Sequence, residues 1–132
     1  MQPNHNVAHG KILLVEDDAD VRMVMRDALE ASGYHVWEAS TGLEALEVWK
    51  STAPHIDLLL TDIIMPGGLN GWELAQKLSK EQPSLKVILM SGYSPDKAGN
   101  MQPQSYMLQK PFTLENLTEI VRSCLDTAHL AH

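Results

Sequence analysis

The sequence predicts an α/β domain in which helices cover both faces of a five-stranded parallel sheet. Short apolar runs alternate along the chain with segments whose apolar residues recur at every third or fourth position. The runs are almost continuously aliphatic, as in Leu58-Leu59-Leu60, which is typical of parallel strands buried on both sides. A length of 132 residues suits one domain with a sizeable core. This alternation predicts five strand and helix pairs joined by right-handed crossovers.

The first part of the chain predicts two strands with a helix between them. The apolar run Lys11–Val15 predicts the first strand. Asp18 is a candidate N-cap for a helix that extends to Gly33, a residue suited to a left-handed helix C-terminus. The second strand is expected over residues 34–38. Apolar residues at helical spacing predict the buried face of the helix: Val21, Val24, Met25, Ala28 and Leu29.

The middle of the chain predicts a third strand with one helix before it and one after it. Thr41 and Glu44 have the spacing of a capping box, so a helix is expected to begin there and to end at Pro54. The run His55–Asp62 predicts the third strand. The next helix is expected from about residue 71 to residue 83, with Leu74, Ala75 and Leu78 inward.

The last part predicts two strands and a long final helix. The strands are expected over Leu85–Ser91 and Ser105–Gln109. The segment that joins them contains Pro95, Gly99, Asn100 and Pro103, so the helix expected there must be short or frayed. Thr113 is the candidate N-cap of the last helix. The inner face of this helix is expected to comprise Leu114, Leu117, Val121, Cys124, Leu125 and Ala128.

Composition and charge limit the classes of function. Residues 1–10 form a polar segment that we expect to be disordered, residues 11–128 form the domain, and residues 129–132 form a short tail. Ten Lys and Arg against 17 Asp and Glu give a net charge of −7, which argues against nucleic acid as a direct ligand. Neither a membrane span nor a secretory signal is expected, so a cytoplasmic protein is predicted. The lone cysteine, Cys124, excludes an internal disulfide.

Functional side chains gather where the predicted strands end. Glu16 and Asp17 follow the first strand, Asp62 ends the third, Ser91 ends the fourth, and Lys110 follows the fifth. The carboxyl ends of parallel strands lie at one edge of the sheet, which is where such sheets bind ligands. Each of these residues taken singly is more easily explained as a solvated loop residue or a turn residue. Their coincidence at one edge favours a functional site.

The acids of this edge predict a divalent cation. If the first and third strands are neighbours, Glu16, Asp17 and Asp62 converge, and carboxylates that close repel one another unless a cation or a proton intervenes. Two or three carboxylates with a backbone carbonyl and waters are what Mg2+ prefers. Asp57 lies at the opposite end of the third strand, roughly 17 Å from Asp62, and is therefore excluded from the site.

These residue types support capture of a phosphoryl group by a carboxylate. Asp62 would attack phosphorus as the nucleophile and form an aspartyl phosphate. The cation and Lys110 would neutralise charge on the phosphoryl oxygens, and Ser91 would donate its hydroxyl to the new phosphoryl group.

Four motifs span the ends of the predicted strands: Leu14–Asp18, Thr61–Pro66, Leu89–Tyr93 and Gln109–Thr113. Together they resemble the signatures of the response-regulator receiver domain of bacterial two-component signalling, in the CheY-like superfamily. The resemblance covers about residues 11–128, and the loop over residues 66–71 is similar to that of receivers found with hybrid histidine kinases. It implies a flavodoxin-like (βα)5 three-layer sandwich with strand order 2-1-3-4-5, which makes the first and third strands neighbours.

The resemblance also implies the site and its chemistry. Asp62 is expected to receive phosphate from a phosphohistidine on a histidine kinase or a histidine phosphotransfer protein. Mg2+, with Mn2+ as a substitute, is expected between Glu16, Asp17, Asp62 and the backbone carbonyl of Ile64. A cis peptide bond is expected between Lys110 and Pro111. The protein would not be an enzyme beyond phosphorylating itself and losing the phosphate slowly.

The output is expected to pass through the surface of the domain. After about Ala128 the chain has no room for an effector domain, so phosphorylation would change the affinity for an unknown protein target. The protein is expected to be a monomer or a weak dimer that associates through the fourth helix, the fifth strand and the fifth helix. Ile64 and Tyr93 occupy places where polar residues in relatives orient water, so slow loss of phosphate is expected.

Three other functions remain open from the sequence. An aspartate-nucleophile phosphatase would also use Mg2+, but it would want a second acid at the position of Ile64. A nucleotide or flavin binder would want a Gly-rich loop after the first strand, where acids stand instead. A phosphorylation-independent interaction module would need none of these side chains.

Overall fold

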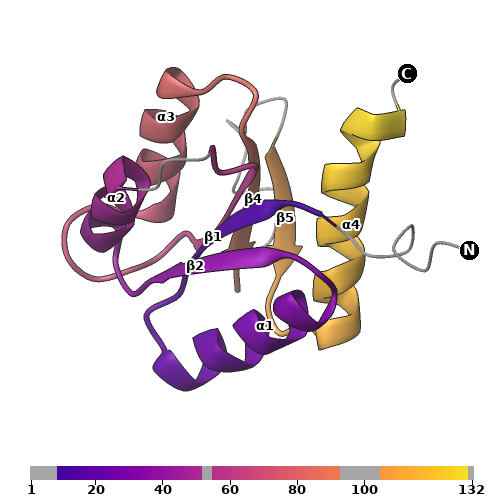
Figure 1. Cartoon of the computed structure of the whole chain (residues 1–132). Coiled ribbons are helices and arrows are strands. Elements are labelled where there is room, and N and C mark those ends of the chain that lie inside the picture. Colours follow the sequence, from indigo (N-terminus) through magenta and orange to yellow (C-terminus); the bar gives the residue numbers. More distant parts are fainter. Residues whose placement is uncertain (1–8, 52–54, 93–104, 131–132) are drawn as a thin grey trace, which may run out of the picture.

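The computed structural model describes residues 9–51, 55–92 and 105–130, with side chains to residue 126, as one sheet flanked by helices (Figure 1). The strands are β1 (Lys11–Val15), β2 (His35–Ala39), β3 (Leu58–Asp62), β4 (Lys86–Ser91) and β5 (Ser105–Gln109). The helices are α1 (Ala19–Ala31), α2 (Gly42–Ser51), α3 (Gly71–Glu81) and α4 (Leu114–Leu130). None of the helices in these described ranges is long and apolar enough to cross a membrane.

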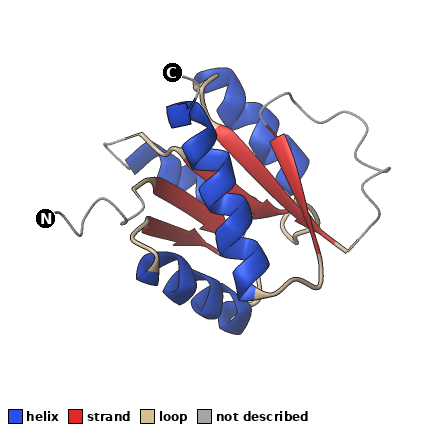
Figure 2. Cartoon of the chain, turned by 90° about the vertical axis from the view of Figure 1, so that its right-hand side faces the viewer, coloured by secondary structure: helices blue, strands red, loops and turns tan. Residues whose placement is uncertain are grey.

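The sheet has the strand order β2-β1-β3-β4-β5, and every pair of neighbouring strands is parallel. Helices α1 and α4 lie on one face and α2 and α3 on the other, as Figure 1 and the turned view in Figure 2 show. This confirms the predicted α/β class, the flavodoxin-like three-layer sandwich and the order that the resemblance implied. The strands β1 and β3 are neighbours, so the ends that carry the acids lie side by side.

The core has two halves because successive residues of a strand point to opposite faces of the sheet. In β1, Ile12 and Leu14 pack under α1 and α4, whereas Leu13 and Val15 pack under α2 and α3. All four are fully buried, and burial of one aliphatic side chain is worth roughly 1.5 to 3 kcal/mol. Cys124 is buried in the first half, and this burial raises the pKa of its thiol to about 11. This placement confirms Cys124 as a packing residue.

The ends of α1 agree with the sequence. The carboxylate of Asp18 accepts hydrogen bonds from the backbone N–H groups of Asp20 (3.0 Å) and Val21 (3.1 Å), as an N-cap does. Gly33 has a φ of +105° just beyond the helix, where a side chain would be strained. Because Asp18 belongs to the loop that carries Glu16, this loop also fixes the start of α1.

The caps of α2 and α3 differ from the prediction. The Thr41 hydroxyl accepts from the Glu44 N–H (3.0 Å), but the Glu44 carboxylate accepts from the N–H of Ser40 (2.7 Å) rather than from Thr41. A complete capping box lies instead at α3, between Asn70 and Glu73. Helix α3 begins at Gly71, as predicted, but this cap was not predicted.

Some residues expected to face inward are exposed. Val21 is 40% exposed, Val24 48% and Leu114 43%, although all three belong to predicted apolar faces. The apolar stripe of α1 is wider than the part of the helix that meets the sheet, so only Met25 and Leu29 are buried. The exposed residues lie near one another, at the starts of α1 and α4.

Several predictions fall outside the described residues. Most of the N-terminal segment (1–8), the end of the second helix at Pro54 and the expected fourth helix (93–104) are among them. A weak dimer through that fourth helix is therefore untested. Helix α4 follows β5 and corresponds to the last of the five expected helices.

Candidate functional site

The three predicted acids meet at the carboxyl edge of β1 and β3. One carboxylate oxygen from each of Glu16, Asp17 and Asp62 lies within 4.8 Å of those from the other two. Glu16 is 2% exposed and Asp62 5% exposed, whereas Asp17 is exposed. The acids converge because β1 and β3 are parallel neighbours and the acids lie at or directly after the carboxyl ends of these strands. Buried, clustered carboxylates with an open side fit a divalent cation.

Lys110 joins this cluster from the loop after β5. Its Nζ lies 2.6 Å from Oδ1 of Asp62 and 3.4 Å from Oε1 of Glu16. Its backbone N–H donates to the carbonyl oxygen of Ser91 (2.7 Å), which ties the loop to the end of β4. The bond between Lys110 and Pro111 is cis, as the resemblance implied. The lysine therefore bridges two of the three acids.

The electrostatics of the site follow from burial and charge. Burial, with the nearby Asp62 carboxylate, raises the pKa of Glu16 from 4.5 to about 7. Burial works to lower the pKa of the Lys110 ammonium, but contacts with Asp62 and Glu16 outweigh it and raise that pKa. Burial and the neighbouring carboxylate therefore disfavour the negatively charged form of Glu16 in the metal-free protein. A divalent ion bound between the acids would favour that form.

The remaining predicted residues lie at the same edge. Ser91 ends β4 and is 6% exposed, one residue after Met90, whose register partner in β3 is Asp62. Ile64 follows in the loop with its side chain 61% exposed. Its backbone carbonyl as a cation ligand stays a prediction.

Gly71 supports the geometry of the site, and this role was not predicted from the sequence. It begins α3, and its N–H donates to the carbonyl oxygen of Ile63 (2.8 Å). A Cβ atom at this position would overlap the carbonyl oxygen of Asp62. Only glycine therefore allows α3 to start against the end of β3. A glycine at the first position of the predicted helix that follows the Asp62 strand was the available signal.

Asp57 lies away from the acids, as predicted. It precedes β3, and its carboxylate accepts a hydrogen bond from the backbone N–H of Lys11 (2.8 Å) at the start of β1. The two acids of this run thus stand at opposite edges of the sheet. Asp57 is available as a control for substitutions at Asp62.

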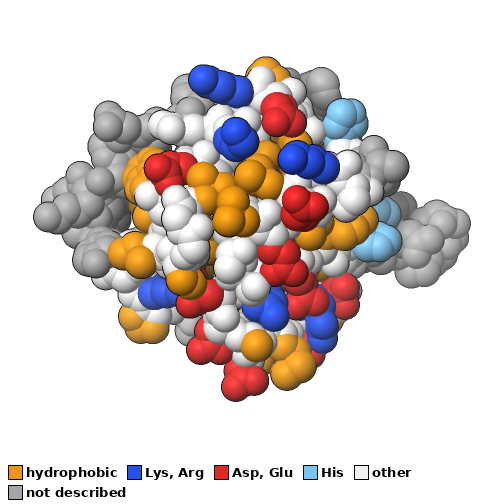
Figure 3. Space-filling model, turned by 90° about the vertical axis from the view of Figure 1, so that its left-hand side faces the viewer, with side chains coloured by type: hydrophobic (Ala, Val, Ile, Leu, Met, Phe, Trp, Pro, Cys, Tyr) orange, Lys and Arg blue, Asp and Glu red, His pale blue; other side chains and the backbone are white. Residues whose placement is uncertain are grey.

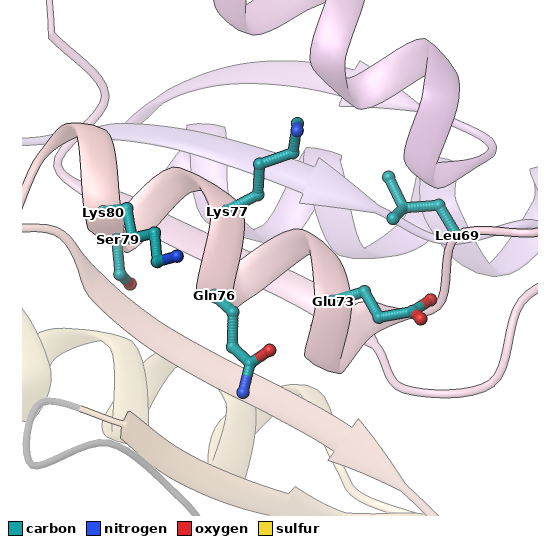
Figure 4. A pocket seen from close by; sticks show the side chains of 6 residues that line it. All are labelled: Leu69, Glu73, Gln76, Lys77, Ser79 and Lys80. Carbon is teal, nitrogen blue, oxygen red and sulfur yellow. The ribbon is translucent and has the colours of Figure 1, made fainter.

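A hollow of about 660 Å3 lies along the outer surface of α3, away from the clustered acids (Figure 4). Its side chains spread away from the helix, with Lys77 and Gln76 pointing in opposite directions, and none of the three clustered acids lines it. Figure 3 shows the side of the molecule that carries α2 and α3, where acidic and basic side chains are interspersed around a hydrophobic group.

The raised pKa of Glu16 predicts a pH-dependent stability of the metal-free protein. The folded protein holds the Glu16 proton more tightly than the unfolded chain, so its free energy of unfolding should fall as pH rises from about 4.5 to about 7. Glu16→Gln should remove this loss, on the order of 2 kcal/mol at pH 8 and almost nothing at pH 4. Urea unfolding in EDTA at both pH values measures the difference. If the free energies of unfolding of wild type and variant differed equally at both pH values, the raised pKa of Glu16 would be contradicted.

Comparison with known proteins agrees with this geometry. The family model for the response regulator receiver domain matches residues 12–122. The sensor kinase CckA of Brucella abortus (strain 2308) is 37% identical over 118 residues, which cover 87% of this chain but 12% of that protein. The response regulator receiver protein CpdR of the same strain is 36% identical over 124 residues, which cover 89% of this chain and 98% of CpdR.

A solved structure is similar in both sequence and fold. The crystal structure of the receiver domain from the hybrid histidine kinase CckA matches with a TM-score of 0.76 and 38% identity, covering 88% of this chain and 99% of that one. The strand order, the acidic cluster at the edge of the sheet and these matches lead to one assignment. The chain belongs to the response regulator receiver domain family of two-component systems.

Proposed function

We propose that this domain accepts a phosphoryl group on Asp62 from a phosphohistidine and passes the signal on by a change in protein binding. The observation that carries the proposal is the contact of Lys110 Nζ with Asp62 Oδ1 inside a buried cluster of acids. A carboxylate that is paired with an ammonium and lies beside a cation site has the groups needed to attack phosphorus.

The transfer is a displacement at phosphorus. A carboxylate oxygen of Asp62 forms a bond to phosphorus while the bond from phosphorus to the histidine nitrogen breaks, and the electron pair leaves with that nitrogen. Lys110 stays protonated and faces the charge on the phosphoryl oxygens, and the Ser91 hydroxyl donates to one of them. Glu16, Asp17 and Asp62, with the Ile64 carbonyl, would hold Mg2+. When bound, this ion supplies positive charge for the phosphoryl oxygens.

Incubation with acetyl phosphate and Mg2+ tests the proposal. Intact-mass measurement should show the gain of one phosphoryl group in Mg2+ and no gain in EDTA. Steady release of phosphate from phosphoesters without a stable gain would favour the phosphatase alternative. No gain under any condition would favour a phosphorylation-independent interaction module.

A groove beside the site is proposed as the place where the phosphodonor protein docks. It lies between α1 and the start of α4 and has a volume of about 740 Å3. Val24 (48% exposed) and Leu114 (43% exposed) line it together with Phe112, and Lys110 also lines it. Because Lys110 belongs to both the groove and the acceptor site, an occupant of the groove lies next to Asp62. A helical protein that carries a phosphohistidine beside apolar side chains fits this arrangement.

Val24→Ser should slow transfer from a protein donor at least fivefold and leave acetyl phosphate labelling unchanged, because only the protein donor buries this side chain. The donor is an ATP-labelled histidine kinase domain that transfers phosphate to the wild type. Met23→Ser is the matched control, since Met23 is 46% exposed on the same helix but does not line the groove. Equal effects of both substitutions would contradict the proposed docking place.

Ile64→Asn should shorten the lifetime of the phosphorylated protein, because an amide two residues after Asp62 can orient a water for attack on phosphorus. The exposed Ile64 side chain offers no such group and excludes water from the surface it covers. The decay is followed by intact mass after removal of acetyl phosphate, and about a tenfold faster decay is expected. An unchanged lifetime would refute the shielding by Ile64.

A further inference from the structure

We propose that Arg22 is a positioning residue for the cation site, because it fixes the backbone of the acid loop, Glu16–Asp18. The inference rests on the proposed function, since it concerns the same cation. Arg22 lies on α1, one turn after the cap at Asp18. Its Nη1 donates to the carbonyl oxygen of Glu16 over 2.6 Å. This carbonyl belongs to the peptide unit that joins Glu16 and Asp17, two of the three clustered acids.

The contact matters because a peptide unit is planar. Holding the carbonyl of Glu16 also fixes the direction in which the backbone enters Asp17. The other contacts of the loop act elsewhere: the Glu16 N–H donates to the carbonyl oxygen of Ala39 (3.1 Å), and the Asp18 N–H donates to Oε2 of Glu16 (3.1 Å). Arg22 thus adds a restraint to the peptide between the two acids. Asp17 is exposed, so its placement depends on its backbone more than on packing.

Arg22 is itself held in place by Glu38 at the end of β2. Its Nε donates to Oε1 of Glu38 over 3.1 Å, and Arg26 Nη1 donates to Oε2 of the same carboxylate over 3.0 Å. The Arg22 side chain is only 19% exposed. A guanidinium that is clamped by a carboxylate on one side and donates to a carbonyl on the other has little freedom to move. The acid loop is therefore preorganised by a chain of contacts that begins on β2.

Arg26 provides a matched control. It lies one turn after Arg22 on α1 and pairs with the same Glu38 carboxylate. Its side chain contacts Glu38 and Asp27 rather than the acid loop. Loss of Arg26 removes a similar charge and a similar ion pair. It leaves the contact with the Glu16 carbonyl in place. A role of Arg22 in positioning therefore predicts different effects of the two substitutions on cation binding.

The experiment measures Mg2+ affinity by isothermal titration calorimetry at a temperature at which circular dichroism shows each variant folded. Arg22→Met should weaken Mg2+ binding about tenfold, as loss of a group that orients a metal ligand typically does. Arg26→Met should stay within twofold of wild type. Arg22→Lys, which can still donate to the carbonyl, should recover part of the affinity. If Arg22→Met does not fold, Glu38→Ala replaces it and should weaken Mg2+ binding at least twofold.

The outcomes separate the two proposals. A wild-type protein that binds no Mg2+ overturns the proposed function as well as the role of Arg22. Wild-type binding with unchanged affinity in Arg22→Met, or in Glu38→Ala where it replaces that variant, overturns the role of Arg22 alone. An equal loss in Arg22→Met and Arg26→Met also overturns it, because the effect then comes from α1 as a whole.

Discussion

Asp62→Asn is expected to abolish the phosphoryl gain from acetyl phosphate. The amide is a poor nucleophile and carries no negative charge, so neither the attack on phosphorus nor the pairing with Lys110 remains. The shape of the side chain is kept, and the buried position at the end of β3 should be occupied as before. Intact mass in Mg2+ measures the result, and the variant should show less than one hundredth of the wild-type labelling rate.

Asp57→Asn is the control for this experiment. It makes the same chemical change in the same segment, but at the opposite edge of the sheet, where the Asp57 carboxylate accepts from the backbone of Lys11. Labelling should proceed at the wild-type rate. A phosphoryl gain that survives in Asp62→Asn, or that disappears in Asp57→Asn, would mean that phosphate enters elsewhere. Peptide mapping of the labelled protein would then locate the acceptor.

The convergence of the acids could be predicted because it depends on strand ends and strand order. An apolar run that stops at an acid marks the edge of the sheet, as at Val15 followed by Glu16 and at Asp62. To predict that the acids meet, it was also necessary to know that β1 and β3 are neighbours. The resemblance implied this strand order, and the structure confirmed it. The positions of strands and helices can be read from alternating apolar patterns because burial of apolar side chains largely determines them.

The contacts around the acids could not be predicted in the same way. The donation from Arg22 to the Glu16 carbonyl depends on a side-chain conformation and on a carboxylate from β2, neither of which leaves a periodic signal. The overlap that excludes a side chain at Gly71 depends on the distance between α3 and the end of β3. Val24 was predicted to be buried but is exposed. Apolar periodicity identifies an apolar face of a helix, but it does not show whether that face packs in the core or is available to a partner.

Lys110 belongs both to the proposed acceptor site and to the proposed docking groove. The same residue contacts Asp62 and Glu16 and lines the apolar groove. A phosphodonor that docks in the groove would therefore lie close to the ammonium. Phosphorylation would in turn replace the contact between Lys110 and the carboxylate by one with the phosphoryl oxygens, so the lining of the groove would change with the state of the site.

Lys110→Met is therefore expected to separate cation binding from phosphoryl transfer. Without the ammonium, the rate of labelling by acetyl phosphate should fall about 100-fold, the usual cost of losing one charge-stabilising donor at a reacting group. Mg2+ affinity should stay the same or increase, because the cation no longer competes with Lys110 for the acids. Calorimetry and intact mass measure the two quantities on the same sample, and Lys77→Met on the exposed face of α3 is the control for loss of a lysine.

The same substitution should lower the stability of the metal-free protein, and Mg2+ should restore it. Glu16 and Asp62 are almost fully buried, so removal of their shared cation leaves them facing one another. We expect a loss of about 2 kcal/mol at pH 8, less than for a fully buried pair because the Lys110 side chain is 34% exposed. The loss should shrink as pH falls below 7 and Glu16 takes up a proton. A Lys110→Met variant with wild-type labelling and wild-type stability would remove this lysine from the mechanism.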